Sequence, residues 1–124
     1  TQCFIIWDKE QPEDFSTGMC EMAWTSFKSP AKLFSERVTG GEKKVHPTQK
    51  PLSLFQWIID RYTNQGSLIL DPFMGSGTTC VACKKLGRNY IGIEKEPEYI
   101  KIAEKRLEKV NNHKITDFFG ACEA

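Results

Sequence analysis

The fold is decided by Leu68-Ile-Leu-Asp-Pro-Phe-Met-Gly-Ser-Gly-Thr-Thr79. The apolar run from Ser67 to Leu70 follows Gly66 and is too short for a helix, so it predicts a buried strand of a parallel sheet. This strand is expected to end at Asp71. The carboxyl edge of a sheet is therefore expected where the polar residues begin.

A turn with two glycines, Gly75 and Gly77, follows, and helix-forming sequence then runs from residue 78 to residue 86. Glycine has no Cβ, so such a turn lets backbone N–H groups approach a ligand. The turn lacks the third glycine of a dinucleotide fingerprint and the Gly-Lys-Ser/Thr ending of a P-loop. A second apolar strand, residues 89–93, ends at Glu94, whose carboxylate can accept ribose hydroxyls. The pattern predicts a site for an adenosine-containing cofactor.

Three motifs then carry a resemblance to a known family: His46-Pro-Thr-Gln-Lys-Pro51, Asp71-Pro-Phe-Met-Gly-Ser-Gly-Thr-Thr79 and Gly92-Ile-Glu-Lys-Glu-Pro-Glu-Tyr99. In this order they resemble the DNA methyltransferases that methylate amino groups, in the subgroup whose cofactor half follows the catalytic half. The resemblance covers about residues 45–107. It implies an α/β fold with a Rossmann-like methyltransferase sheet, present here in part, and with an antiparallel N-terminal hairpin.

The resemblance implies S-adenosylmethionine as cofactor, double-stranded DNA as partner, and methyl transfer to the exocyclic amine of adenine or cytosine. Carried over residue by residue, it implies these cofactor-binding residues: Thr48, Lys50, Asp71, Phe73, Gly75, Ser76, Gly77, Thr78, Glu94 and Lys95. Thr48 and Lys50 are expected to hold the carboxylate of the cofactor. Asp71 either accepts from its ammonium or braces the turn, and Phe73 lies along the cofactor or is buried in the sheet.

The family's catalytic Asp/Asn/Ser-Pro-Pro-aromatic tetrapeptide has no counterpart, because the sequence contains no Pro-Pro pair. We therefore assign no catalytic residue. We expect a fragment or split half that binds cofactor weakly and does not methylate DNA alone. Two alternatives stay open. One is a nicotinamide-dependent oxidoreductase domain. The other is a non-catalytic module that binds DNA or a partner, either the missing catalytic half or a second copy.

Charge is unevenly distributed along the chain. Residues 1–27 carry a net charge of −4, residues 28–50 carry +4, and the remainder is nearly balanced. A basic segment between folded stretches suits contact with phosphates, although a solvated loop would also explain it. The candidate DNA-binding residues are Lys28, Lys32, Arg37, Lys43 and Lys44.

Four segments are predicted along the chain. They are a hairpin of two late sheet strands at 1–27, a short basic linker or recognition remnant at 28–45, a cofactor-binding αβαβα unit at 46–110, and a tail at 111–124. The first helix of the unit is expected to present Leu54, Phe55, Ile58 and Tyr62 on one face.

The number and spacing of cysteines and histidines argue against disulfide bonds, a redox pair and a metal site. The five cysteines are an odd number without framework spacing, and no signal peptide or membrane-length apolar run is present. Reduced thiols in the cytoplasm are the expectation. Cys80 and Cys83 lie three residues apart on the predicted helix, where packing is favoured over a redox pair. No metal site is predicted, since His46 and His113 are the only histidines.

Overall fold

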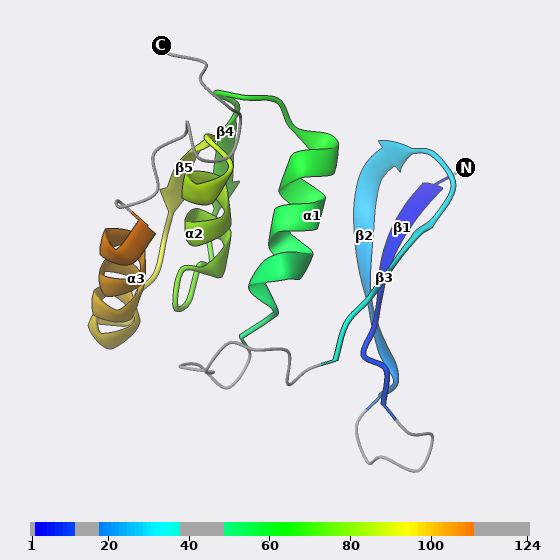
Figure 1. Cartoon of the computed structure of the whole chain (residues 1–124), viewed down its shortest axis with the longest axis horizontal. Coiled ribbons are helices and arrows are strands. Elements are labelled where there is room, and N and C mark those ends of the chain that lie inside the picture. Colours follow the sequence, from blue (N-terminus) through cyan, green and yellow to red (C-terminus); the bar gives the residue numbers. More distant parts are fainter. Residues whose placement is uncertain (1, 12–17, 38–48, 111–124) are drawn as a thin grey trace. The chain divides into compact units, whose positions relative to one another are not determined.

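The computed structural model describes residues 2–11, 18–37 and 49–110. The chain divides into two compact units, Thr1–Glu42 and Lys43–Ala124 (Figure 1). Within the described residues, no helix is long and apolar enough to cross a membrane.

The first unit is a three-stranded sheet in the order β2-β1-β3. Strands β1 (Gln2–Asp8) and β2 (Cys20–Lys28) pair antiparallel, with Phe4 opposite Trp24, which confirms the predicted hairpin. Strand β3 (Lys32–Ser35) pairs parallel with β1. The segment 28–45, predicted as a short basic linker or recognition remnant without a strand of its own, therefore contains one. Four residues are too few to show a strand period, and β3 forms because the other edge of β1 offers its backbone groups for pairing.

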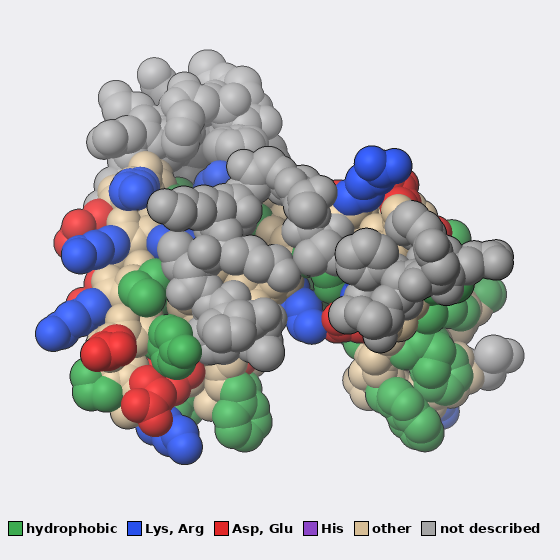
Figure 2. All heavy atoms as spheres, turned by 90° about the horizontal axis from the view of Figure 1, so that it is seen from below, with side chains coloured by type: hydrophobic (Ala, Val, Ile, Leu, Met, Phe, Trp, Pro, Cys, Tyr) green, Lys and Arg blue, Asp and Glu red, His purple; other side chains and the backbone are tan. Residues whose placement is uncertain are grey.

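The two faces of this sheet differ in exposure. Cys3, Ile5 and Trp7 alternate along β1 and are buried. The opposite face carries exposed Trp24 and Leu33, and the Trp24 ring meets the Phe4 ring edge-on at 5.5 Å between centroids. Hydrophobic side chains gather over this sheet in Figure 2. Among the described residues this unit therefore presents an exposed aromatic and aliphatic surface.

The second unit alternates helices and strands. Its elements are α1 (Leu52–Tyr62), β4 (Leu68–Asp71), α2 (Thr78–Lys85), β5 (Asn89–Gly92) and α3 (Pro97–Val110). Strands β4 and β5 pair parallel, with Leu70 opposite Ile91. Helix α2 packs on both strands and lies between α1 and α3 (Figure 1). This is the order of elements that the sequence predicted, and the parallel pairing places both strand ends at one edge.

The core of this unit lies between the helices and one face of β4 and β5. Ile59, Ala82 and Cys83 are its buried centre, and the residues packed on them are Leu52, Phe55, Ile69, Leu86 and Tyr90. Helix α1 contributes Ile59 to this cluster rather than the expected Ile58. The packing prediction for the two helical cysteines is confirmed, since Cys80 and Cys83 are 1% and 0% exposed.

The other face of the two strands is exposed, which contradicts the predicted burial of β4. Leu68 and Leu70 of β4 were predicted to be buried, yet they are 65% and 61% exposed. Ile91 and Ile93, from β5 and its end, are 49% and 53% exposed on the same side. We call these four residues the aliphatic face. Parallel sheets are normally covered on both sides, and no second layer covers this face within the described part of the chain.

Candidate functional site

Asp71 braces the turn that follows β4. Its carboxylate accepts a hydrogen bond from the backbone N–H of Phe73 at 3.0 Å and another from the Thr79 hydroxyl. These bonds tie the end of the strand to the start of α2. Bracing, one of the two roles that the sequence left open for Asp71, is therefore observed. Contact of this carboxylate with a ligand stays a prediction.

Glu94 joins the end of β5 to the same turn. One carboxylate oxygen accepts the backbone N–H of Gly75 at 3.0 Å, and the other accepts the N–H of Glu96 at 3.0 Å. The turn closes through the Gly77 N–H, which donates to the Met74 carbonyl at 2.9 Å. Gly75 and Gly77 have φ values of 55° and 84°, a region that favours glycine. Two adjacent strand ends are thereby linked through one carboxylate.

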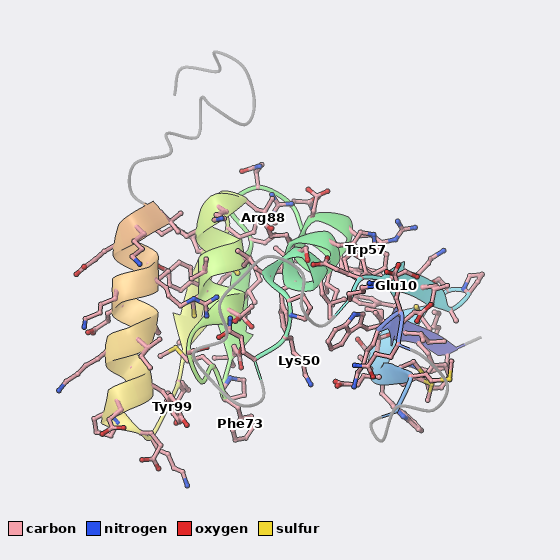
Figure 3. All side chains as sticks on the ribbon, turned by 60° about the horizontal axis from the view of Figure 1, so that its bottom comes forward. Glu10, Lys50, Trp57, Phe73, Arg88 and Tyr99 are labelled. Carbon is pink, nitrogen blue, oxygen red and sulfur yellow. The ribbon has the colours of Figure 1, made fainter. Side chains whose placement is uncertain are left out.

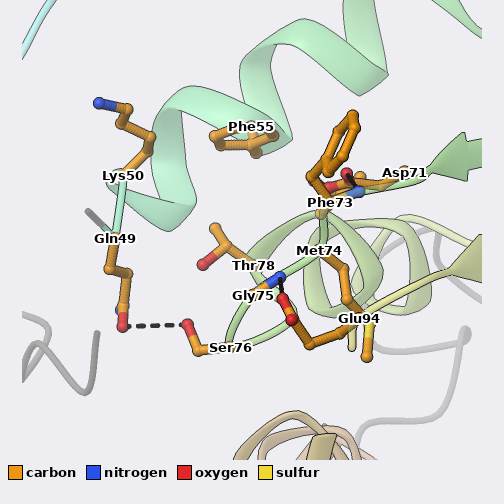
Figure 4. Close-up of a pocket in the computed structure, with 11 residues that line it drawn as sticks. Gln49, Lys50, Phe55, Asp71, Phe73, Met74, Gly75, Ser76, Thr78 and Glu94 are labelled. Carbon is orange, nitrogen blue, oxygen red and sulfur yellow. Dashed lines mark hydrogen bonds between the residues drawn. The ribbon is translucent and has the colours of Figure 1, made fainter. Parts of the chain in front are cut away.

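A cavity of about 360 Å³ opens beside this turn (Figure 4). The residues that line it are Gln49, Lys50, Phe55, Asp71, Phe73, Met74, Gly75, Ser76, Thr78, Thr79 and Glu94. The lining carries two carboxylates and one ammonium, and it contains the aromatic rings of Phe55 and Phe73. A cavity of this size and chemistry suits a small ligand with an apolar ring and groups of both charges.

A hydrogen-bond network lies behind the turn. Arg106 of α3 donates through one guanidinium nitrogen, Nη1, to the Ser76 carbonyl at 2.9 Å, the Ser76 hydroxyl at 3.1 Å and the Thr78 hydroxyl at 3.0 Å. The Ser76 hydroxyl in turn donates to the Gln49 side-chain oxygen at 3.3 Å (Figure 4). The network joins the segment before α1, the glycine turn and α3.

Most predicted cofactor residues meet at the cavity. The residues that line it as expected are Lys50, Asp71, Phe73, Gly75, Ser76, Thr78 and Glu94. Gly77 lies in the turn but is buried and does not line the cavity, and Lys95 is exposed and does not line it either. Thr48 lies outside the described residues. Phe73 is 88% exposed, so its burial in the sheet, the alternative left open, is wrong.

Sequence reasoning missed several members of the site, namely Gln49, Phe55, Met74, Thr79 and Arg106. Arg106 carried one readable signal. It stands three residues after Ala103, and buried Ala103 and Val110 show that this side of α3 faces inward. A charged residue within an apolar helical face needs a polar partner. The helical pattern therefore indicated that Arg106 needs a polar partner, although it did not identify that partner.

The basic residues proposed to contact DNA are placed only in part. Lys28 ends β2 and is exposed, Lys32 lies half-buried in β3, and exposed Arg37 forms an ion pair with Glu10 at 3.8 Å. Lys43 and Lys44 lie outside the described residues, as does His46. DNA contact by all five basic residues stays a prediction.

Burial makes the cysteines of α2 unreactive. It raises the pKa of the Cys80 thiol to about 11, with the nearby Asp71 carboxylate adding to the effect. Burial likewise raises the pKa of the Cys83 thiol to about 11. Both are free thiols and neutral at physiological pH. Within residues 2–11, 18–37 and 49–110, no three His, Cys, Asp or Glu side chains gather as a metal site would require.

Comparison with known proteins decides the family. The DNA methylase family model N6_N4_Mtase matches residues 4–105. The chain belongs to this DNA methylase family. The resemblance read from the three motifs is thereby confirmed, and the match reaches back into β1 and β2.

Two relatives show how much of a methylase this chain represents. The type II methyltransferase M2.DpnII of Streptococcus pneumoniae is 61% identical over 66 residues, which are 53% of this chain and 25% of that protein. The type II methyltransferase M.HinfI of Haemophilus influenzae is 51% identical over 76 residues, 60% of this chain and 21% of that protein. The matched segments thus span a quarter or less of each relative.

Solved structures confirm the methylase fold. The crystal structure of an M1.HpyAVI–SAM complex matches with a TM-score of 0.69 and 39% identity, over 84% of this chain and 60% of that chain. The cytosine-N4-specific PvuII DNA methyltransferase matches with a TM-score of 0.69 at 19% identity, over 86% and 53% of the two chains, and bears on the fold alone. The predicted fold class, a partial Rossmann-like methyltransferase sheet with an antiparallel hairpin, is confirmed.

Proposed function

We propose that this chain forms the S-adenosylmethionine-binding half of a DNA methyltransferase that modifies the exocyclic amine of adenine or cytosine. The observation that carries the proposal is the cavity at the carboxyl edge of β4 and β5, where the Glu94 carboxylate and the glycine turn meet. Family membership and the 39% identical relative described as a SAM complex support the same cofactor.

The lining chemistry fits this cofactor better than a nicotinamide dinucleotide. The Glu94 carboxylate is held at the cavity by two backbone N–H groups, and a carboxylate is a suitable acceptor for ribose hydroxyls. Lys50 and the Thr78 hydroxyl suit a carboxylate, and the exposed Phe73 ring suits an adenine. The two acidic groups, Asp71 and Glu94, favour a cationic ligand and disfavour a diphosphate.

When bound, S-adenosylmethionine supplies an activated methyl group on a sulfonium. The residues of this chain then hold and orient the cofactor, and catalysis depends mainly on keeping two reactants in a near-attack geometry. The sequence has no Pro-Pro pair to position a target amine. We therefore propose that the 124-residue chain does not methylate DNA alone. Incubation with DNA and methyl-labelled cofactor checks this, and methyl incorporation above background contradicts it.

Calorimetric titration tests cofactor binding directly. The purified chain is titrated with S-adenosylmethionine and, in parallel, with NAD. We expect heat of binding from the first ligand and none from the second at the same concentrations. Glu94→Gln removes a charged acceptor. It is expected to weaken S-adenosylmethionine binding by about 10- to 100-fold, the range for hydrogen bonds to charged groups.

Glu98→Gln is the matched control, because Glu98 is an exposed carboxylate in the first turn of α3 and does not line the cavity. It is expected to change the affinity by less than about twofold. Equal losses in the two variants would show that overall charge, and not the ribose contact, determines binding. Binding of NAD in place of S-adenosylmethionine contradicts the proposed function.

Double-stranded DNA is the proposed macromolecular partner. Lys28, Lys32 and Arg37 supply positive charge in the first unit, and Lys43 and Lys44 extend the basic segment. A Lys28→Glu/Lys32→Glu variant is expected to weaken DNA binding and flatten its dependence on salt concentration, since each phosphate contact releases counterions. Lys101→Glu/Lys105→Glu, on the exposed side of α3, is the control. An equal effect of both pairs contradicts a specific role for the segment.

Binding of a partner chain is a second candidate function, favoured by the aliphatic face. Its four residues are about half or more exposed on one side of a parallel sheet. Such a surface is normally covered. Sedimentation velocity is expected to show concentration-dependent association of the chain, reduced in an Ile91→Lys variant. A monomer at every concentration, in both proteins, counts against association between copies.

A further inference from the structure

The interactions of Arg106 point to a role in shaping the cofactor site. Its Nη1 atom carries two hydrogens and faces three acceptors, two on Ser76 and one on Thr78, all between 2.9 and 3.1 Å. The contacts cross 28 to 30 positions of sequence, from α3 to Ser76 in the turn and to Thr78, the first residue of α2. Arg106 is itself half-buried. One guanidinium group therefore holds the backbone and both hydroxyls of this turn.

Arginine has no hydrogen-bond acceptor, so the direction of each bond is determined. The Ser76 hydroxyl accepts from Arg106 and must use its own hydrogen elsewhere, which it donates to Gln49 at 3.3 Å. The Thr78 hydroxyl also accepts from Arg106, so its hydrogen points away from the guanidinium. Thr78 lines the cavity, and Figure 4 shows its side chain directed into the space below Lys50.

We infer that Arg106 is a positioning residue for the amino-acid end of the cofactor, an inference that rests on the proposed function. By donating to one lone pair of the Thr78 hydroxyl, Arg106 turns the hydroxyl hydrogen away from the guanidinium, so that this group can donate toward the cavity. A hydroxyl donor in the cavity that Lys50 also lines suits the carboxylate of S-adenosylmethionine. Arg106 contacts the turn and the ligand contacts Thr78, so the arginine acts through the turn.

The inference predicts a selective effect on ligands. Arg106→Met is expected to lower the affinity for S-adenosylmethionine by about tenfold or more. It is expected to change the affinity for 5′-methylthioadenosine by less than about twofold, because that compound has the nucleoside and thioether but no amino-acid carboxylate. Lys105→Met is the matched control. It removes the same charge from the neighbouring exposed position of α3 and should alter neither affinity.

A second variant keeps the test independent of folding defects in the first. Thr78→Val keeps the branched shape and replaces the hydroxyl with a methyl group, and it should reproduce the selective loss. The Arg106→Met/Thr78→Val double variant should bind no more weakly than the weaker single variant, because both changes remove the same donor.

The outcomes separate this inference from the proposed function. A wild-type chain that binds neither ligand contradicts the proposed function, and the role of Arg106 falls with it. A wild-type chain that binds both, with Arg106→Met weakening the two equally or neither, overturns the positioning role alone. Thr78→Val without a selective loss also overturns it.

Discussion

Replacement of Gly77 by alanine is the sharpest test of how the glycine turn, the segment between β4 and α2, is packed. Gly77 precedes α2 with φ of 84°, and a Cβ there would lie 2.6 Å from the Ala103 Cβ and 3.2 Å from the Ala103 Cα. Real Cβ atoms do not approach other atoms so closely. The nearest atoms belong to the backbone and first side-chain carbon of α3, which cannot rotate away. The variant must therefore move α3 or distort the turn.

Two penalties add in Gly77→Ala. A left-handed backbone conformation costs an L residue about 1–2 kcal/mol, and an extra carbon in a tightly packed site costs about 1–3 kcal/mol. The free energy of unfolding should therefore fall by about 2–5 kcal/mol. Gly66 separates the two penalties. Its φ is 77°, but a Cβ there meets nothing within 4 Å. Gly66→Ala should lower the free energy of unfolding by the backbone penalty alone, about 1–2 kcal/mol.

Urea unfolding followed by far-ultraviolet circular dichroism measures both losses, since the three described helices all lie in the second unit. Ala103→Gly provides a second check, because it removes the nearest atom. By itself it should cost about 1 kcal/mol of helix propensity, and it should recover part of the loss when combined with Gly77→Ala. If Gly77→Ala costs no more than Gly66→Ala, the close contact with α3 is refuted.

Two further predictions concern the stability of the second unit. Arg88 follows the C-terminal end of α2, far from Phe73, which precedes the helix (Figure 3). Its buried guanidinium donates to the Leu86 carbonyl and to two oxygens of Thr63. Arg88→Met should therefore cost about 3 kcal/mol in urea unfolding. Asp60→Asn should cost less than about 1 kcal/mol, because the Asp60 carboxylate is exposed and lies 3.7 Å from the guanidinium; equal losses would contradict this ranking. Burial raises the pKa of the Cys80 and Cys83 thiols from 9.0 to about 11, so the folded state holds protons that the unfolded state releases. The stability contributed by these thiols should be retained below about pH 9 and lost as pH rises toward 11. When the free energy of unfolding is measured at several pH values, it should fall less steeply with pH in the Cys80→Ala/Cys83→Ala variant. An unchanged slope would rule out the two thiols as the cause of the fall.

The glycine turn could be predicted from sequence because the residues that determine it are close together in the chain. The apolar run, Asp71, the spacing of Gly75 and Gly77, and the carboxylate after the next strand all lie within 28 residues, Ser67 to Glu94. The two strands of a βαβ unit pair in parallel and therefore end at the same edge of the sheet. This places Glu94 beside the turn, where its carboxylate accepts the Gly75 N–H. Seven of the ten predicted cofactor residues accordingly line one cavity.

Other features depend on contacts between distant segments, which have no local pattern. β3 is a strand because the edge of β1 accepts it, and Arg106 belongs to the site because α3 crosses behind Ser76 and Thr78. The exposure of Leu68 and Leu70 depends on which layer covers β4, whereas their apolar character alone predicts burial.

The sequence by itself therefore determined the strand–turn–helix unit, the family and the cofactor edge, since backbone preferences and motif spacing act over short distances. Only the tertiary structure decided which side chains hold the turn in place and which apolar face is exposed among the described residues. These outcomes depend on the packing of helices and strands far apart in the chain.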